Sequence, residues 1–157
     1  MPVTSADLSA TETLIAIESI KQLKARYFRA VDTKDWAGLA ELFCIDATLD
    51  AGVAVRDGRD EIVRTMSRAL ADVVSVHHGH MPEITVADDR SATGIWAMDD
   101  HLEWPTQSTE RGAPVGFRGS GHYHDHYRLD HDGRWRFRSV VLTRIRIDPL
   151  AGGMATR

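Results

Sequence analysis

The spacing of apolar residues changes once along this chain, after Ala71, and that change limits the folds open to it. Before it, apolar side chains recur at steps of three and four, as on an amphipathic helix. After it, the chain is rich in β-branched and aromatic residues, as in strands. Helices followed by antiparallel strands predict an α+β domain in which the helices cover one face of a curved sheet.

The length of the chain suits one such unit. With 157 residues, of which 43% are hydrophobic, it can bury one sizeable core. We therefore expect a single domain over 1–157, with flexible tails at 1–8 and 149–157. The C-terminal tail lacks any apolar period, so we expect it to be ordered only if something packs on it.

Three helices are predicted in the first half of the chain. Ser9 and Glu12 have the spacing of a capping box, in which the two side chains satisfy backbone N–H groups at the start of a helix. A long amphipathic helix is expected to follow. Asp35 is predicted to cap a second helix that includes Phe43, and Asp57 is predicted to cap a third.

The second half is predicted to form the sheet. Strands are expected at 47–50, 73–87, 92–104, 117–130 and 134–147. Pro and Gly near both ends of 105–116 predict a polar loop there. A curved sheet wrapped around a long helix leaves a cone whose open end can hold a small apolar ligand.

Charge and composition restrict the partners. The formal net charge of −4 is spread over both signs, without a run of like charge long enough to follow a phosphate backbone, so nucleic acid is not expected. The N-terminus has no signal-peptide pattern, and no apolar run approaches the roughly 18 residues that span a bilayer. Cys44 can form no internal disulfide. We expect a soluble, cytoplasmic protein without a membrane partner.

Two carboxylates and a tyrosine are candidates for chemistry. Asp32 falls at the predicted end of the first helix, where the macrodipole disfavours negative charge; it is either a solvated turn residue or a carboxylate directed into the cone. Asp100 shares a strand face with Trp96 and Met98, so its pKa should rise unless a partner holds it ionised. It could instead form a salt bridge at the rim. Tyr27 either packs in the core or donates a hydrogen bond to a substrate oxygen.

Histidines gather in two places, at 77–80 and at 122–126. Imidazoles with the spacing H-x-H bind zinc or iron when further ligands arrive from another strand. Nothing else in the sequence fixes a ligand set, and such pairs are common on solvated strands. We therefore predict no metal site.

The first histidine cluster leaves open which ring faces the cone. Strict alternation along 73–87 places His78 and His80 on the apolar face and leaves His77 pointing away. A bulge at Gly79 would reverse this assignment on one side of it, because one extra residue moves every side chain across the sheet. Periodicity does not decide between the two.

Several segments together resemble the SnoaL-like branch of the nuclear transport factor 2-like superfamily, and most closely its bile acid 7α-dehydratases. Scytalone dehydratases and hexachlorocyclohexane dehydrochlorinases are more distant relatives. The segments that carry the resemblance are 26–36, 76–85, 92–100 and 133–146, within a likeness over about 12–147. It implies a cone-shaped α+β barrel with a mostly antiparallel sheet, used by lyases, isomerases and cyclases that need no cofactor.

The resemblance also implies catalytic residues. The tyrosine of a Y-F-R motif matches Tyr27, and the aspartate five residues later matches Asp32. The first histidine of an H-x-G-H-x-P-E-I-T strand matches His77. A strand aspartate and a later arginine match Asp100 and Arg144. Because the related dehydrochlorinases pair an aspartate with a histidine at the matching positions, Asp32 and His77 are expected to form a dyad. That role for His77 requires a bulge or twist near Gly79.

The implied reaction is elimination of water from a carbonyl-bearing polycyclic or aromatic molecule, with His77 as the general base and no metal or organic cofactor. Isomerisation or ring closure in the same cavity, and a non-catalytic ligand-binding module, are the alternatives. A homo-oligomer is expected, with a trimer favoured over a dimer by analogy. The 105–116 segment and the C-terminal tail are candidate lids. Residues expected to contact the substrate are His78, His80, Trp96, Met98 and His122.

Overall fold

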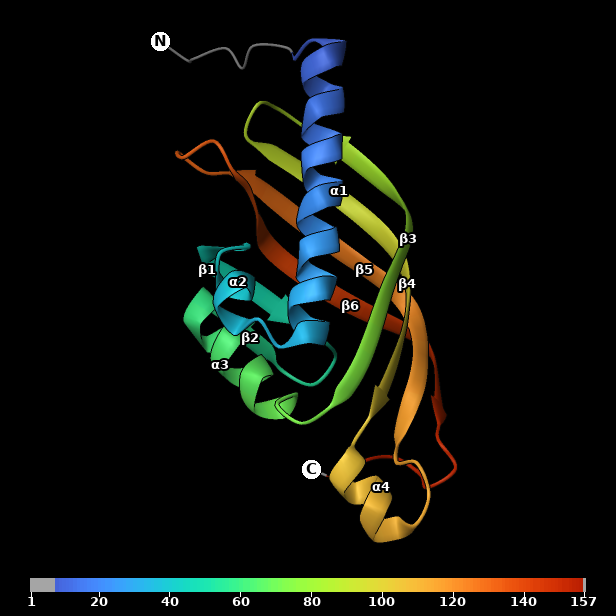
Figure 1. The fold of residues 1–157 in the computed structure, drawn as a ribbon. Helices are drawn as coiled ribbons and strands as arrows, with labels where there is room; N and C mark the ends of the chain where they lie inside the picture. Colours follow the sequence, from blue (N-terminus) through green and yellow to red (C-terminus); the bar gives the residue numbers. More distant parts are fainter. Residues whose placement is uncertain (1–7, 157) are drawn as a thin grey trace.

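Helices precede most of the strands, as the spacing of apolar residues predicts. A computed structural model describes residues 8–156, so all but the last residue of the expected tail at 1–8 lies outside the described residues. Within that range the chain forms an α+β fold with four helices and six strands (Figure 1). In chain order these are α1 (Ala10–Thr33), α2 (Trp36–Ala40), β1 (Phe43–Asp50), β2 (Val55–Asp57), α3 (Arg59–Ala69), β3 (Val74–Val86), β4 (Ser91–Glu103), α4 (Pro105–Arg111), β5 (Gly116–Leu129) and β6 (Trp135–Pro149).

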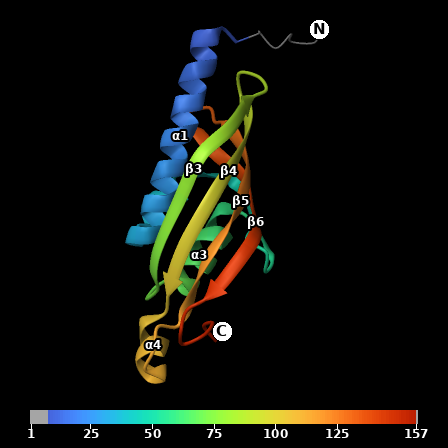
Figure 2. The same cartoon turned by 90° about the vertical axis from the view of Figure 1, so that its right-hand side faces the viewer.

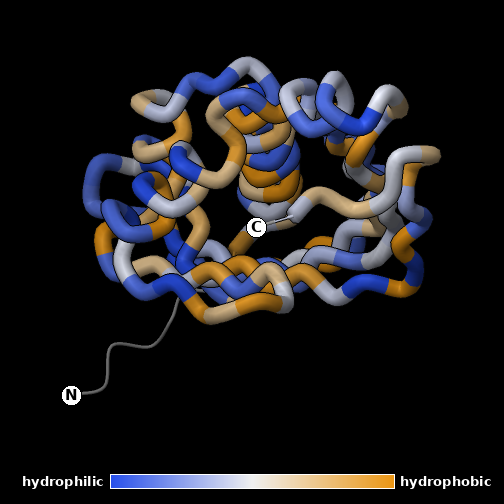
Figure 3. Tube along the Cα trace, turned by 90° about the horizontal axis from the view of Figure 1, so that it is seen from below, coloured by the Kyte–Doolittle hydropathy of each residue, from blue (hydrophilic) through white to orange (hydrophobic). Residues whose placement is uncertain are grey.

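The strands form a single curved sheet in the order β2-β1-β6-β5-β4-β3. Neighbouring strands are antiparallel except for β1 and β6, which are parallel. Helix α1 runs alongside the sheet, with β3 beside it, and appears end-on in the middle of the molecule when seen from below (Figures 2 and 3). This arrangement confirms the predicted cone-shaped fold with a mostly antiparallel sheet.

The start of α1 confirms the predicted capping box. The Ser9 hydroxyl accepts a hydrogen bond from the Glu12 backbone at 3.2 Å, and the Glu12 carboxylate accepts one from the Ser9 backbone at 2.9 Å. The last residue of the helix is Thr33, and the cap residue Lys34 after it adopts a left-handed conformation with φ of 62°. Asp35 caps α2 through the backbone N–H of Gly38 at 2.9 Å. The turn between α1 and α2, which contains Lys34 and Asp35, is therefore held by hydrogen bonds to both helices.

Two predicted helix limits are wrong. Helix α2 stops at Ala40, and Phe43 instead begins β1, where its backbone pairs with Phe137 of β6. Asp57 does not cap α3, because it belongs to β2 and pairs with Thr48. The cap position of α3 is Gly58, which has no side chain to cap the helix. Strand pairing, which local periodicity does not report, sets both limits.

The segment predicted as a polar loop contains a helix. Pro105 occupies the first turn of α4, where its missing N–H costs nothing, and Gly112 ends the helix with φ of 65°. The C-terminal segment 150–156 packs on this helix: Arg111 donates to the Gly152 carbonyl at 3.0 Å, and Gln107 bonds to Thr156. The condition for order in the tail is therefore met.

Alternating side chains of the sheet and one face of α1 form the core. Trp96, Met98, Asp100 and Leu102 are all buried on the inner face of β4, as predicted. Tyr27 and Phe28 of α1 pack against aromatic rings of β5 and β6. The inner surface of the cone is thus largely aromatic.

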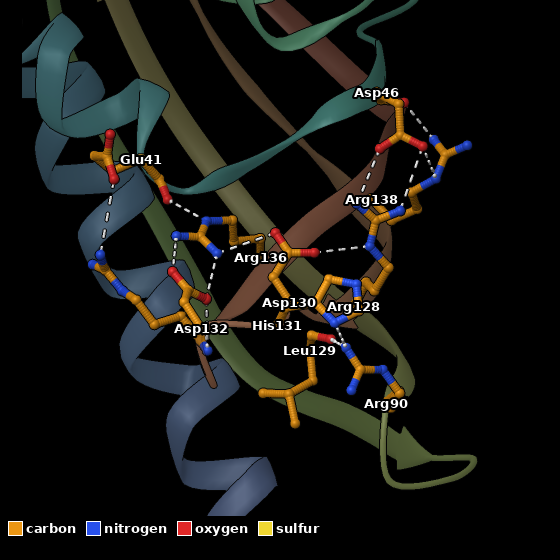
Figure 4. A network of polar contacts seen from close by, with 11 residues as sticks. Glu41, Asp46, Arg90, Arg128, Leu129, Asp130, His131, Asp132, Arg136 and Arg138 are labelled. Carbon is orange, nitrogen blue, oxygen red and sulfur yellow. Dashed lines mark hydrogen bonds and ion pairs between the residues drawn. The ribbon is translucent and has the colours of Figure 1, made fainter.

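Arginine and aspartate side chains tie the β5–β6 hairpin together (Figure 4). Arg136 donates to both oxygens of Asp132 at 2.8 and 2.7 Å, and this pairing lowers the pKa of Asp132 to about 2. Arg128 bridges Asp130, at 2.9 Å, and Asp46 of β1, at 3.1 Å. These charges face one another in the structure, so we assign them to the hairpin and not to the site.

Candidate active site

The C-terminal end of α1 meets β3 through Asp32 and His77. The Asp32 Oδ1 atom lies 2.6 Å from His77 Nδ1, and its Oδ2 atom accepts a hydrogen bond from the His77 backbone N–H at 2.9 Å. Ser75 donates to Oδ1 at 2.9 Å and accepts from Lys34 at 3.1 Å. The carboxylate is held at several points, which fixes the orientation of the imidazole.

The direction of the His77 side chain depends on a bulge in β3. The register with β4 shifts between Gly79 and Pro82, so that β3 gains one residue relative to its partner. Before the bulge Ser75, His77 and Gly79 face inward, and after it the inward positions begin at Pro82. The irregularity near Gly79 that the assignment of His77 requires is therefore present.

His78 and His80 point outward, so the inward placement derived from strict alternation is wrong. Their side chains are 60% and 58% exposed, and both bond to Asp99 of β4, at 3.2 and 2.6 Å. Alternation fails here because it was counted from the apolar residues on the C-terminal side of the bulge. The extra residue in the bulge reverses the facing of the residues on its N-terminal side.

The dyad has a defined proton arrangement. Burial acts to raise the pKa of Asp32, but hydrogen bonds from the His77 side chain and backbone and from Ser75 outweigh it, so the pKa lies below its usual value. An ionised carboxylate only accepts hydrogen bonds, so His77 Nδ1 must carry a proton. In neutral His77 the Nε2 atom is then unprotonated, and it can accept a proton from a ligand.

A buried ion pair lies beyond His77 Nε2. Asp100 accepts two hydrogen bonds from Arg144, at 2.8 and 2.6 Å, and its Oδ2 atom lies 3.9 Å from His77 Nε2. Arg144 is thus the charged partner of the buried Asp100 carboxylate. The pair crosses β5 over Gly119, where a Cβ atom would lie 2.5 Å from Asp100 Oδ1 and closer still to Arg144. A residue without a side chain makes this contact possible.

Two tyrosines complete the interior, and only one was predicted. Tyr27 is 4% exposed, and burial, with the Asp125 charge, raises its pKa above the usual value. Tyr123 of β5 is equally buried; its ring centroid lies 6.2 Å from that of Tyr27, and its pKa is also raised by burial. Both hydroxyls therefore stay protonated and able to donate. Alternation along 117–130 places Tyr123 inward, which is the signal that could have identified it.

A second buried ion pair was not predicted. Lys24 of α1 and Asp125 of β5 are fully buried and lie 2.8 Å apart. Tyr127 donates to the same Asp125 oxygen at 2.8 Å and accepts from the Trp96 indole at 2.9 Å. Lys24 also lies over the Tyr123 ring, 3.6 Å from its centroid. The position of Lys24 on the apolar stripe of α1 is the sequence signal for its burial.

The predicted substrate contacts separate into two groups. Met98 is packed in the core, and His122 lies on the outer face of β5, where its ring neighbours that of His124 at 6.4 Å. His122 is therefore not brought to the dyad, because it alternates with the inward Tyr123. Over residues 8–156, no cluster of three or more suitable side chains could hold a metal ion.

The other predicted contacts, His78, His80 and Trp96, line a cleft with His77. This cleft of about 720 Å³ lies between α1 and β3, the edge strand of the sheet. Its volume falls in the range of small-molecule sites. The cleft residues are Lys21, Lys24, Ala25, Phe28, His77, His78, Gly79, His80, Met81, Pro82 and Trp96.

Within the described part of the chain, no helix is long and apolar enough to cross a membrane.

Fold and site together define a class of small α+β cone domains with a histidine–aspartate pair beside a ligand-sized cleft. The chain belongs to the SnoaL-like domain family, whose model matches residues 12–141. This family has the nuclear transport factor 2-like fold, so both the family and the fold implied by the sequence are confirmed.

Solved structures share this fold at low sequence identity. A type 2 hexachlorocyclohexane dehydrochlorinase (LinA) is 18% identical, with a TM-score of 0.79 over 95% of this chain and 98% of its own. A Novosphingobium aromaticivorans protein assigned as a scytalone dehydratase is also 18% identical, with a TM-score of 0.79 over 95% and 94%. A variant of Rv3472, a Mycobacterium tuberculosis protein of unknown function, is 26% identical, with a TM-score of 0.71 over 85% and 78%.

Proposed function

We propose that this protein is a cofactor-independent dehydratase acting on a carbonyl-bearing polycyclic or aromatic small molecule. The observation that carries the proposal is the 2.6 Å contact between Asp32 and His77 Nδ1, which leaves His77 Nε2 directed to the interior. Similar structures include a dehydrochlorinase and a protein assigned as a dehydratase, both named for eliminations. The specific likeness to bile acid 7α-dehydratases stays a prediction.

His77 is the general base in this scheme. Its Nε2 atom takes a proton from the carbon next to the carbonyl, and Asp32 stabilises the resulting imidazolium. The electrons of the broken C–H bond form the new C=C bond as the C–O bond breaks, and the imidazolium returns its proton to the departing hydroxide, which leaves as water. A positioned general base contributes roughly 10²- to 10⁴-fold to the rate.

Tyrosine and arginine stabilise the charge that develops. Tyr27 donates a hydrogen bond to the carbonyl oxygen as it gains negative charge, a contribution on the order of 10²-fold. Arg144 adds positive charge at the same end of the cone. Asp100 is not assigned a proton-donating role, because both of its oxygens are occupied by Arg144. It positions the guanidinium instead.

Substitution of the dyad tests the proposal. Once a substrate is found in a screen of steroid, polyketide and aromatic-catabolite libraries, His77→Gln and Asp32→Asn should each lower kcat/KM by at least about 100-fold. His126→Gln, an exposed histidine on the outer face, is the matched control and should keep full activity. Full turnover by His77→Gln would refute the scheme. Product analysis separates dehydration from isomerisation or ring closure, and ligand binding without turnover would indicate a binding module.

We also propose that the protein is a cytoplasmic homo-oligomer, with a trimer favoured. Support comes from apolar side chains left exposed on the outer face of the sheet, because contiguous apolar patches on soluble proteins usually mark interaction sites. Val74 and Val76, two residues apart on β3, are 59% and 44% exposed, and Ile145 of β6 is 73% exposed. A second copy of the chain would cover these side chains.

A further inference from the structure

Lys34 has a backbone conformation that a residue with a side chain disfavours. It follows α1 as the cap residue with φ of 62° and ψ of 28°, and among residues 8–156 it is the one residue other than glycine with a positive φ. Glycine is the usual residue at such a position, because a Cβ atom in the left-handed region crowds the following carbonyl oxygen. The turn by itself therefore favours glycine, and the reason for a lysine lies in its side chain.

The Lys34 side chain is directed back to the dyad. Its ammonium donates to the Ser75 hydroxyl at 3.1 Å, and Ser75 donates to Asp32 Oδ1 at 2.9 Å. The same carboxylate oxygen lies 2.6 Å from His77 Nδ1. An ammonium only donates hydrogen bonds, so Ser75 must accept from it, and its own proton is directed to Asp32. Partial burial lowers the pKa of Lys34, and the Asp32 charge acts in the opposite direction.

Four charged groups lie around His77, two carboxylates and two cations. Asp32 contacts Nδ1, and Asp100 Oδ2 lies 3.9 Å from Nε2. Arg144 is paired with Asp100 at 2.6 Å. In the described part of the chain no arginine or lysine forms an ion pair with Asp32, so Lys34, one hydroxyl away, supplies the second cation. Carboxylates alone would favour the imidazolium, whereas a general base must be free of its proton.

We propose that Lys34 is a positioning residue of the candidate active site, whose ammonium directs the Ser75 hydroxyl to Asp32 and opposes protonation of His77. The proposal rests on the proposed function, in which His77 accepts a proton from the substrate. Lys34 acts through Ser75 and Asp32 and not on the substrate itself. It occupies a turn that favours glycine because the site requires its charge. Its replacement by glycine should therefore improve the fold and impair the dyad.

Histidine NMR on the full chain tests this role without a substrate. Lys34→Met removes the ammonium and keeps a long side chain, whereas Lys34→Gly also removes the Cβ atom. In both, the pH midpoint of the His77 imidazole signal, identified by its loss in His77→Gln, should rise by about 0.3–1 pH unit at low ionic strength, the effect of one charge within about 9 Å. Lys34→Arg keeps the charge and should keep the midpoint. Arg26→Met, which removes an exposed cation of α1, is the matched control and should also keep it.

Thermal unfolding separates the charge from the backbone. Both Lys34→Met and Lys34→Gly lack the ammonium, but only the methionine variant has a Cβ atom in the left-handed region. Lys34→Gly should therefore have a Tm about 2–4 °C above that of Lys34→Met. A higher Tm together with the same displaced His77 midpoint shows that the lysine serves the site and not the turn.

The outcomes separate this proposal from the proposed function. An unchanged His77 midpoint in Lys34→Met and Lys34→Gly, or an equal rise in Lys34→Arg or Arg26→Met, would overturn it. So would a Tm of Lys34→Gly no higher than that of Lys34→Met, since the turn would then show no preference for glycine. A midpoint that depends on the Lys34 charge supports this role even if full turnover by His77→Gln rules out the elimination scheme. Loss of turnover in His77→Gln with an unmoved midpoint in the Lys34 variants rules out the role of Lys34 alone.

Discussion

Replacing Gly119 by alanine should destabilise the protein through the ion pair that crosses it. The backbone of Gly119 is not among those with a positive φ, so alanine can adopt its conformation. Without a clash, the smaller entropy of the unfolded chain would make Gly119→Ala stabilising by about 0.4–1 kcal/mol. The new Cβ would instead lie 2.5 Å from Asp100 Oδ1 and closer to the Arg144 guanidinium. Overpacking of this kind costs about 1–3 kcal/mol, so the expected sign is opposite.

A double-mutant cycle in urea identifies the cause. Arg144→Ala alone should cost about 3–5 kcal/mol, because it leaves the buried Asp100 carboxylate without its partner. In the Arg144→Ala background, Gly119→Ala should lower the free energy of unfolding by less than half of what it does in the wild type, because the guanidinium is gone. Circular dichroism reports the free energy of unfolding of the four proteins. Equal effects of Gly119→Ala in both backgrounds, or a stabilising effect in the wild type, would refute the geometry.

Three further outcomes follow from the charges and the exposed face. Asp32 has a lowered pKa, so its contribution to stability is present above its ordinary value of 3.8 and is lost as pH falls through the folded pKa. In urea denaturation, the free energies of unfolding of wild type and Asp32→Asn should therefore differ by about 1–3 kcal/mol at pH 7, and this difference should disappear in acid. Lys24→Met should cost about 3–5 kcal/mol by leaving Asp125 buried and unpaired, and Lys24→Met/Asp125→Leu should recover at least half in the same assay. Ile145→Glu should lower the mass measured by light scattering if the outer face joins copies of the chain, and an unchanged mass would exclude that face.

Local patterns predicted most of the fold because they depend on neighbouring residues. The capping box of α1 and the inward face of β4 at Trp96, Met98 and Asp100 follow from spacing in single elements, and the structure contains both. The limits of α2 and α3 were missed because they depend on the pairing of β1 with β6 and β2. These pairings involve strands distant in the sequence or too short to show a period.

The candidate site was predictable only in part for the same reason. Lys24 and Asp125 are separated by 101 residues, and no local pattern links them. The resemblance to a family selected His77 because it compared whole segments, whereas alternation selected His78 and His80. Alternation could not find the extra residue in β3, since a bulge leaves the residue types on each side unchanged. It changes only which face of the sheet they occupy.

The bulge resolves a conflict between the site and the core. The dyad requires Ser75 and His77 to face α1, whereas the core requires Ile84 and Val86 to face it as well. Their positions have opposite parity, so a regular strand of period two could satisfy one pair but not both. One extra residue between Gly79 and Pro82 satisfies both requirements. Because Gly79 has no side chain, the Phe28 ring can pack directly against the backbone of β3 at this position. The bulge therefore brings His77 to Asp32 while the same strand still closes the core.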